Sequence, residues 1–104
     1  MVLKLTKETF SEQIKQGVAL VDFGAPWCAP CRMLDPIINE LAVEFESSAT
    51  IAKVNVDDQP ELASRFSVMG LPTVILFKDG TPVDALRGLQ SKDVLKSSLL
   101  SQLG

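Results

Sequence analysis

The 104-residue sequence has no histidine and only two cysteines, which narrows the metal sites that it can form. A structural zinc site needs four ligands, and an iron–sulfur cluster usually needs four thiolates. One chain therefore cannot supply the cysteine and histidine ligands of either site. An ion shared between two copies of the chain is the remaining alternative, and we expect no metal and no other cofactor.

The sequence also lacks long apolar runs, basic clusters and an apolar leader. No apolar stretch approaches the roughly 18 residues of a membrane-spanning helix, and the first residues do not resemble a signal peptide. Lysine and arginine are scattered singly in a chain of net charge −3, which argues against nucleic acid or anionic lipid as a partner. We expect a cytoplasmic monomer with a single domain over residues 1–104 and no membrane partner.

Helical and strand-like patterns of apolar residues alternate along the chain. The predicted helices cover about 7–15, 29–46, 58–66 and a last segment after Ser91, and the predicted strands cover 18–23, 51–56, 73–77 and 82–87. We expect Thr6 and Ser91 to cap the first and last helices, and Leu95, Leu99 and Leu103 to face inward. Pro82 places the last strand at or near an edge of the sheet. This order predicts an α/β fold with a central mixed sheet covered by helices on both faces.

Cys28 and Cys31 lie between a predicted buried strand and a predicted long helix. On the first turn of a helix their Cα atoms would be about 5 Å apart, within the range of about 4.4–6.8 Å that a disulfide accepts. A structural disulfide is the weaker interpretation, because closing so short a ring stabilises a fold by only about 2 kcal/mol. The pair therefore indicates a redox switch.

The position of each cysteine suggests a separate role in thiol–disulfide exchange, which needs an attacking thiolate and a second thiol that resolves the mixed disulfide. Cys28 at the start of the helix faces unpaired backbone N–H groups and the positive end of the helix dipole, which favour the thiolate. Cys31 lies one turn further along and lacks that field. We predict that Cys28 is the nucleophile and Cys31 the resolving thiol.

Several motifs, in the right order, resemble the thioredoxin family over essentially the whole chain. The matching segments are Val21–Phe23, Ala25–Cys28, Pro30–Met33, Pro36, Lys53–Asp57, Gly70–Thr73, Phe77–Gly80 and Gly88. The resemblance implies the thioredoxin fold and a protein-disulfide reductase that works through a reversible Cys28–Cys31 disulfide in cell redox homeostasis. It also implies two kinds of partner, a flavin-dependent thioredoxin reductase and disulfide-containing client proteins.

The resemblance assigns roles to residues beside the cysteines. Asp22 interrupts an apolar strand, where a carboxylate without a partner is costly. It matches the family's buried aspartate, which implies a raised pKa and a role in deprotonating Cys31. Lys53 matches the lysine beside that aspartate, and it is expected to tune the redox pair together with Ala29 and Pro30. The alternatives are a solvent-facing Asp22 and a merely exposed Lys53.

The resemblance also implies a substrate groove. Pro72 matches a cis proline that the family places against the disulfide, and the backbone at Leu71 could then pair with an extended substrate segment. We expect Trp27, Leu71, Pro72 and Gly88 to line a shallow apolar groove together with the two residues between the cysteines. A Trp27 buried in the core is the alternative.

Two positions depart from the common family pattern. Gly24 stands where an aromatic residue is usual, so a packing group above Asp22 is missing. Ala29 stands where glycine is usual, and it is expected to shift the redox potential by at most about 20 mV. These changes bear on redox poise and on recognition by a reductase.

Two other functions remain as alternatives. An oxidase or isomerase of the same fold would typically carry a histidine between the cysteines and work in an oxidising compartment. A docking module would use the fold without its redox chemistry, and would keep its function when both cysteines are replaced by serine.

Overall fold

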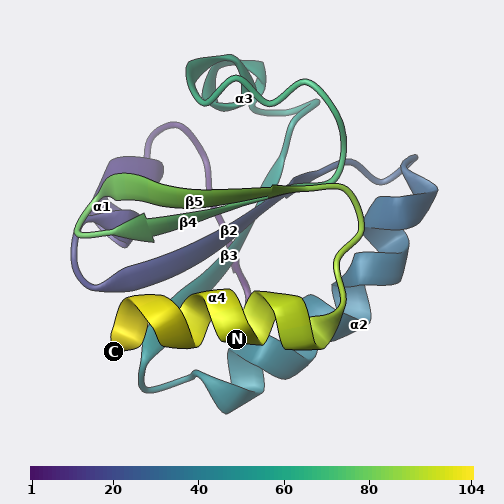
Figure 1. Ribbon diagram of the computed structural model, residues 1–104. Helices are drawn as coiled ribbons and strands as arrows, with labels where there is room; N and C mark the ends of the chain where they lie inside the picture. Colours follow the sequence, from purple (N-terminus) through teal and green to yellow (C-terminus); the bar gives the residue numbers. More distant parts are fainter.

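A five-stranded mixed sheet, in the order β1–β3–β2–β4–β5, forms the centre of the computed structural model, which describes residues 1–104 (Figure 1). The strands are β1 (Leu3–Lys4), β2 (Val18–Gly24), β3 (Ala49–Asn55), β4 (Thr73–Lys78) and β5 (Thr81–Arg87), and the helices are α1 (Phe10–Ile14), α2 (Ala29–Glu44), α3 (Pro60–Arg65) and α4 (Lys92–Leu103). The predicted α/β architecture is confirmed, and only the short β1 was missed. None of the four helices is both long and apolar enough to cross a membrane.

The central strand is β2, and all seven of its residues are buried. It pairs in parallel with β3 on one side and antiparallel with β4 on the other. A strand in this position must be apolar on both faces, which explains its almost continuous apolar sequence. At the edge of the sheet, β5 pairs only with β4 and is largely exposed, as the proline at position 82 predicted.

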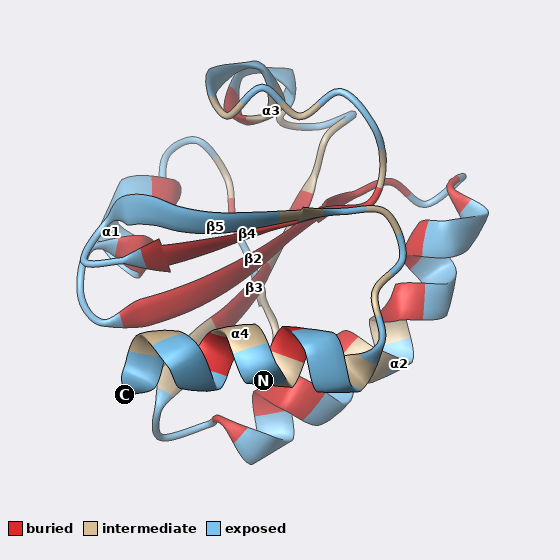
Figure 2. Ribbon diagram, viewed as in Figure 1, coloured by how far each residue is buried: buried red, intermediate tan, exposed pale blue.

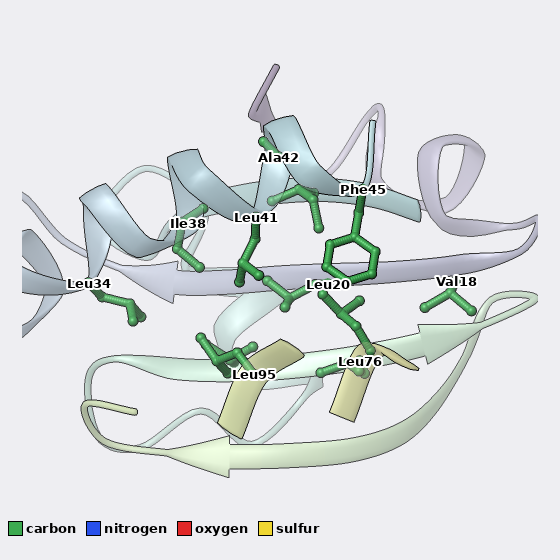
Figure 3. Close-up of a cluster of buried hydrophobic side chains, with 12 residues drawn as sticks. Val18, Leu20, Leu34, Ile38, Leu41, Ala42, Phe45, Leu76 and Leu95 are labelled. Atoms are coloured by element: carbon green, nitrogen blue, oxygen red, sulfur yellow. The ribbon is translucent and has the colours of Figure 1, made fainter. Parts of the chain in front are cut away.

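Side chains alternate across β2 and so divide the core into two layers. Figure 2 shows β2 buried along its length in the middle of the molecule. Val18 and Leu20 pack against α2 and α4, in a cluster that Figure 3 shows. Ala19, Val21 and Phe23 belong to the second cluster, which includes residues of α1 and α3. The same alternation puts residue 22 on the face that α2 covers.

The first helix is shorter than the sequence predicted, because the turn before it is held in another way. The prediction that Thr6 caps the helix is wrong: the N-cap residue is Thr9, and α1 begins at Phe10. The Thr9 hydroxyl accepts a hydrogen bond from the Thr6 backbone N–H at 3.0 Å. The Thr6 carbonyl accepts from Phe10 N–H at 2.9 Å, so a turn leads into the helix, but the Thr6 hydroxyl lies against the Thr9 hydroxyl and caps no backbone N–H.

The last helix follows the prediction at its start but not at its end. Ser91 Oγ accepts a hydrogen bond from Val94 N–H at 3.2 Å, so the predicted cap is confirmed. Leu95 and Leu99 are fully buried, but Leu103 is 38% exposed, so its predicted inward position is wrong. In this final turn of α4 the Gln102 carbonyl accepts a hydrogen bond from Nζ of Lys78, the last residue of β4, at 3.1 Å.

Candidate functional site

The two cysteines lie at the connection between β2 and α2. The strand ends at Gly24, and α2 begins at Ala29 with Cys28 as its N-cap residue in an extended conformation. Pro30 follows in the first helical turn, where its missing N–H costs no hydrogen bond and its fixed φ suits a helix. The sequence thus builds a rigid helix start directly at the end of the most buried strand.

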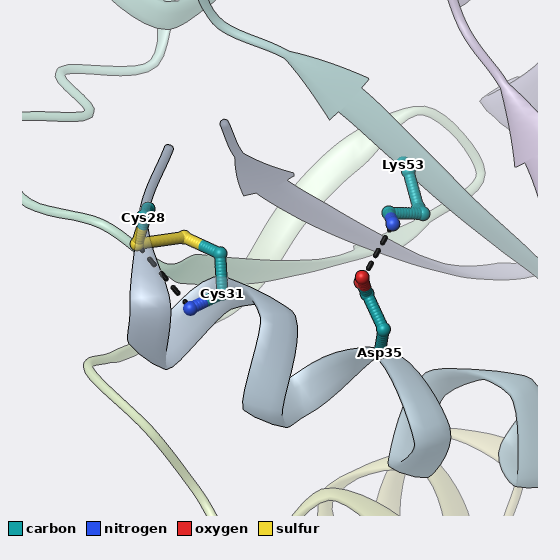
Figure 4. Close-up of polar contacts among 4 residues, drawn as sticks. All are labelled: Cys28, Cys31, Asp35 and Lys53. Atoms are coloured by element: carbon teal, nitrogen blue, oxygen red, sulfur yellow. Dashed lines mark hydrogen bonds and ion pairs between the residues drawn. A yellow bond between two sulfur atoms is a disulfide. The ribbon is translucent and has the colours of Figure 1, made fainter. Parts of the chain in front are cut away.

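Cys28 and Cys31 form a disulfide with a Cα–Cα distance of 5.2 Å, as the spacing predicted (Figure 4). The Cys31 backbone N–H donates to Cys28 Sγ at 3.2 Å. Only 6% of Cys28 and 5% of Cys31 is exposed, so solvent access does not distinguish the two residues. The hydrogen bond at the helix start distinguishes the two residues, since it supplies a donor to Cys28 Sγ that would stabilise a thiolate there.

Asp22 is buried beneath this pair, with 1% of the residue exposed. Its Oδ1 has no hydrogen-bond partner. Burial raises the pKa of Asp22 to about 7; Lys53 lowers it in part, and the nearby charge of Asp35 raises it. The solvent-facing alternative for Asp22 is therefore wrong, and a carboxyl that can gain or lose a proton near neutral pH lies beside the cysteines.

Lys53 lies opposite Asp22 in the β2–β3 register but pairs with a different carboxylate. Its Nζ lies 2.6 Å from Asp35 Oδ1 on α2 (Figure 4). Sequence reasoning did not identify Asp35. The available signal was its spacing, because a residue four positions after Cys31 lies on the same side of the helix. This ion pair engages the lysine while Asp22 Oδ1 keeps no partner.

A groove of about 960 Å³ lies on the Cys28 side of the disulfide. Its lining includes Trp27, Cys28, Ala29, Pro30 and Leu71, all of them at the predicted site. Eight of the twelve lining residues are hydrophobic, so the surface suits an apolar segment of a partner.

Two predicted groove residues, Pro72 and Gly88, are not part of this lining. The Gly88 N–H donates to the Pro72 carbonyl at 2.8 Å, so the two residues contact each other. The Leu71–Pro72 peptide bond is cis, as the resemblance implied. The groove continues instead toward α3, with Pro60, Ala63 and Ser64, which sequence reasoning missed because they are distant along the chain.

The side chain of Trp27 is 68% exposed, which rules out the alternative of a buried core aromatic. Its Nε1 donates to Asp57 Oδ2 at 2.8 Å, so an exposed indole is held in one orientation. Met69, 94% exposed, lies in the same groove. Nothing in the sequence pattern singled out Asp57 or Met69 for these positions. No group of three or more cysteine or carboxylate side chains is placed to hold a metal ion.

Comparison with known proteins gives one family for the whole chain. The thioredoxin family model matches residues 1–101. Thioredoxins of Staphylococcus haemolyticus and Staphylococcus aureus are 47% and 45% identical over 98 residues, which is 94% of this chain and 94% of each relative. The solved structure of a mutant thioredoxin from Halobacterium salinarum matches with a TM-score of 0.91 and 38% identity, covering 98% of this chain and 90% of that chain.

The Asp22→Asn substitution should stabilise the protein increasingly as the pH rises. Between about pH 4 and pH 7 the folded protein holds a proton that the unfolded chain releases, so the free energy of unfolding of the wild type falls across this range. At about 1.4 kcal/mol per pKa unit, the advantage of the variant grows by about 4 kcal/mol from pH 4 to pH 8. Urea unfolding at both pH values measures it. Asp93→Asn, which removes an exposed carboxylate, is the control, and an advantage independent of pH would contradict the raised pKa.

The Asp35→Asn substitution should lower the pKa of Asp22, which burial would still hold above the ordinary value of an aspartate. It removes a negative charge that raises this pKa, and it frees Lys53 to approach Asp22. The ¹³C chemical shift of the Asp22 carboxyl carbon, titrated in the oxidised protein, reports the change directly. Asp58→Asn, on an exposed acid that does not contribute to this pKa, should have a smaller effect. An unchanged or higher pKa in Asp35→Asn would disprove the assigned influence of the ion pair.

Proposed function

The chain belongs to the thioredoxin family, and from that membership we propose that it reduces disulfides in client proteins and is returned to its dithiol form by a flavin-dependent thioredoxin reductase. Thiol–disulfide exchange through Cys28 and Cys31 is the activity of the protein. The proposal that Cys28 attacks the client rests on the hydrogen bond from Cys31 N–H to Cys28 Sγ at the start of α2.

The Cys28 thiolate attacks one sulfur of a client disulfide and forms a mixed disulfide, while the second client sulfur leaves as a thiolate. Asp22 takes the proton of the Cys31 thiol, and the Cys31 thiolate then attacks Cys28 Sγ. This second step releases the reduced client and closes the Cys28–Cys31 disulfide. Two electrons have passed from the protein to the client.

The apolar groove on the Cys28 side suits a protein client better than a small-molecule substrate. An extended client segment would lie along Trp27 and the backbone at Leu71, with its disulfide above Cys28. Pro72 and Gly88 are proposed to act from behind this surface, since they contact each other and do not line the groove. Ala29, Pro30 and Lys53 are proposed to tune the redox pair, and Lys53 does so through Asp35 and Asp22.

A reductase role is consistent with a compartment where thiols are kept reduced. We therefore propose a cytoplasmic monomer with one domain over residues 1–104. Its partners are client proteins and the reductase, with no nucleic acid and no membrane among them. An oxidase or a docking module is the less favoured alternative, and reduction of insulin by the wild type in the experiment below would argue against both.

Reduction of insulin with NADPH and a purified thioredoxin reductase tests the function and the reductase together. The wild type should turn over many insulin disulfides per molecule, and Cys28→Ser should turn over none because the attacking thiolate is gone. Cys31→Ser should remain joined to insulin through a disulfide that survives non-reducing electrophoresis. A wild type that is not reduced by the enzyme, or a Cys31→Ser protein that captures nothing, would contradict the proposed roles.

The Asp22→Asn variant should resolve mixed disulfides more slowly near or below neutral pH, by about tenfold to a hundredfold, because the proton acceptor for Cys31 is missing. The difference should shrink toward pH 9, where the thiol ionises without help. Stopped-flow measurement of client release from the Cys28 mixed disulfide at pH 6, 7.5 and 9 gives the comparison. An equal deficit at all three pH values would argue against Asp22 as the proton acceptor.

A further inference from the structure

A second cavity, of about 480 Å³, opens on the other cysteine of the redox pair. Its lining includes Asp22, Gly24 and Cys31, and it shares no residue with the groove beside Cys28. The two sulfurs therefore belong to two separate openings. The two cysteines are almost equally buried, so their exposure does not favour one opening over the other as the route to the disulfide.

Gly24 is the residue that leaves this cavity in contact with the sulfur. A Cβ atom at this position would lie 3.2 Å from Cys31 Sγ and 3.8 Å from Asp22 Oδ1. Any side chain here would therefore stand directly against both groups. Without one, Cys31 and Asp22 both line the cavity.

The carboxyl at the bottom of the cavity has no protein partner. Asp22 is 1% exposed, and its Oδ1 accepts no hydrogen bond. A buried polar atom of this kind is costly unless something else satisfies it. Lys53, the cation opposite in the register, is engaged by Asp35. The cavity thus offers a reactive sulfur and a free acceptor side by side.

The outer part of the cavity carries charges of both signs. Apart from the buried Asp22, the charged residues of the lining are the cations Lys4, Arg32 and Lys53 and the acids Asp35 and Asp58. Lys4, Arg32 and Asp58 are exposed and lie at the mouth. A ligand that carries both amino and carboxylate groups can pair with such a rim, and the volume lies in the usual range for small-molecule sites.

We propose that this cavity is a second substrate site, which admits low-molecular-weight disulfides with amino and carboxylate groups to the sulfur of Cys31. The proposal deepens the proposed function, since it rests on the same dithiol and adds a substrate class. Protein clients are too large for the cavity and react at Cys28 through the apolar groove.

The chemistry at this site balances without a further reactant. In the reduced protein Asp22 takes the proton of the Cys31 thiol, and the thiolate attacks one sulfur of the small disulfide. A Cys31 mixed disulfide forms, and the other half of the small disulfide leaves as a thiolate. Cys28 thiolate then attacks Cys31 Sγ, which closes the protein disulfide and releases the second small thiol. The protein loses two electrons, and the small disulfide gains them.

Reaction of the Cys28→Ser protein with cystine isolates this site, because Cys31 is then the only thiol in the chain. Intact mass measurements follow the formation of the mixed disulfide at Cys31. In the double variant Cys28→Ser/Gly24→Trp this reaction should be at least about tenfold slower than in Cys28→Ser alone, because the indole fills the space that cystine must occupy. Val43→Trp in the same background is the matched control. This residue of α2 is 73% exposed and lines neither opening, so cystine should react at the unchanged rate.

A Gly24→Ala variant keeps the test decisive if the larger substitution impairs folding, which circular dichroism would reveal. Its Cβ lies against the sulfur, so the reaction should again slow relative to Val43→Trp. Equal rates in folded Gly24 variants and in the control would overturn the proposal. So would equal rates for cystine and for the uncharged probe 2-hydroxyethyl disulfide, since the charged rim would then select nothing.

The outcome is separable from that of the insulin experiment. Insulin turnover depends on Cys28 and a protein substrate, whereas the cystine reaction is measured in protein that lacks Cys28. Turnover of insulin together with no cavity-dependent reaction at Cys31 would remove the second site and leave the reductase function intact.

Discussion

A carboxyl group without a partner on the most buried strand is the constraint around which the redox site is arranged. Burial of Asp22 costs stability whenever the group is ionised, and its raised pKa expresses that cost. An apolar residue on the same strand would avoid it. A fold that tolerates such a group at one position of an otherwise apolar strand gains a proton acceptor whose ionisation changes near neutral pH.

The two-residue period of β2 decides which groups meet this carboxyl. Residues 18, 20, 22 and 24 share the face that α2 covers, and the parallel register brings Lys53 of β3 beside Asp22. The helix adds Cys31 and Asp35 from above. A one-residue slip of β2 would move Asp22 and Gly24 to the α1 and α3 side together, so strand register and redox chemistry are set by the same hydrogen-bond ladder.

Local patterns were sufficient to predict most of the fold and the core of the site. The alternation of apolar segments predicted the sheet and its helices, and the spacing of Cys28 and Cys31 predicted a bond across one helical turn. Contacts between distant segments were beyond such patterns. The pairing of Lys53 with Asp35, the bond from Trp27 to Asp57 and the contribution of α3 to the groove all depend on how separate elements pack. The errors at Thr6 and Leu103 arose at helix ends, where one side-chain hydrogen bond or one missing neighbour decides where the helix begins or whether a residue is buried.

The difference between the two cysteines comes from the backbone rather than from depth. Both residues are almost completely buried, yet only Cys28 Sγ receives an N–H from the first turn of α2. If exposure set reactivity, the two sulfurs would be nearly equivalent. The helix start makes the two sulfurs different, and their surroundings add to the difference. The groove at Cys28 is mainly apolar, whereas the cavity at Cys31 is lined by Asp22 and other charged side chains. In the proposed mechanism one sulfur is the anion and the other gives its proton to a neighbouring base, and this difference in surroundings would supply the asymmetry that stepwise disulfide exchange requires.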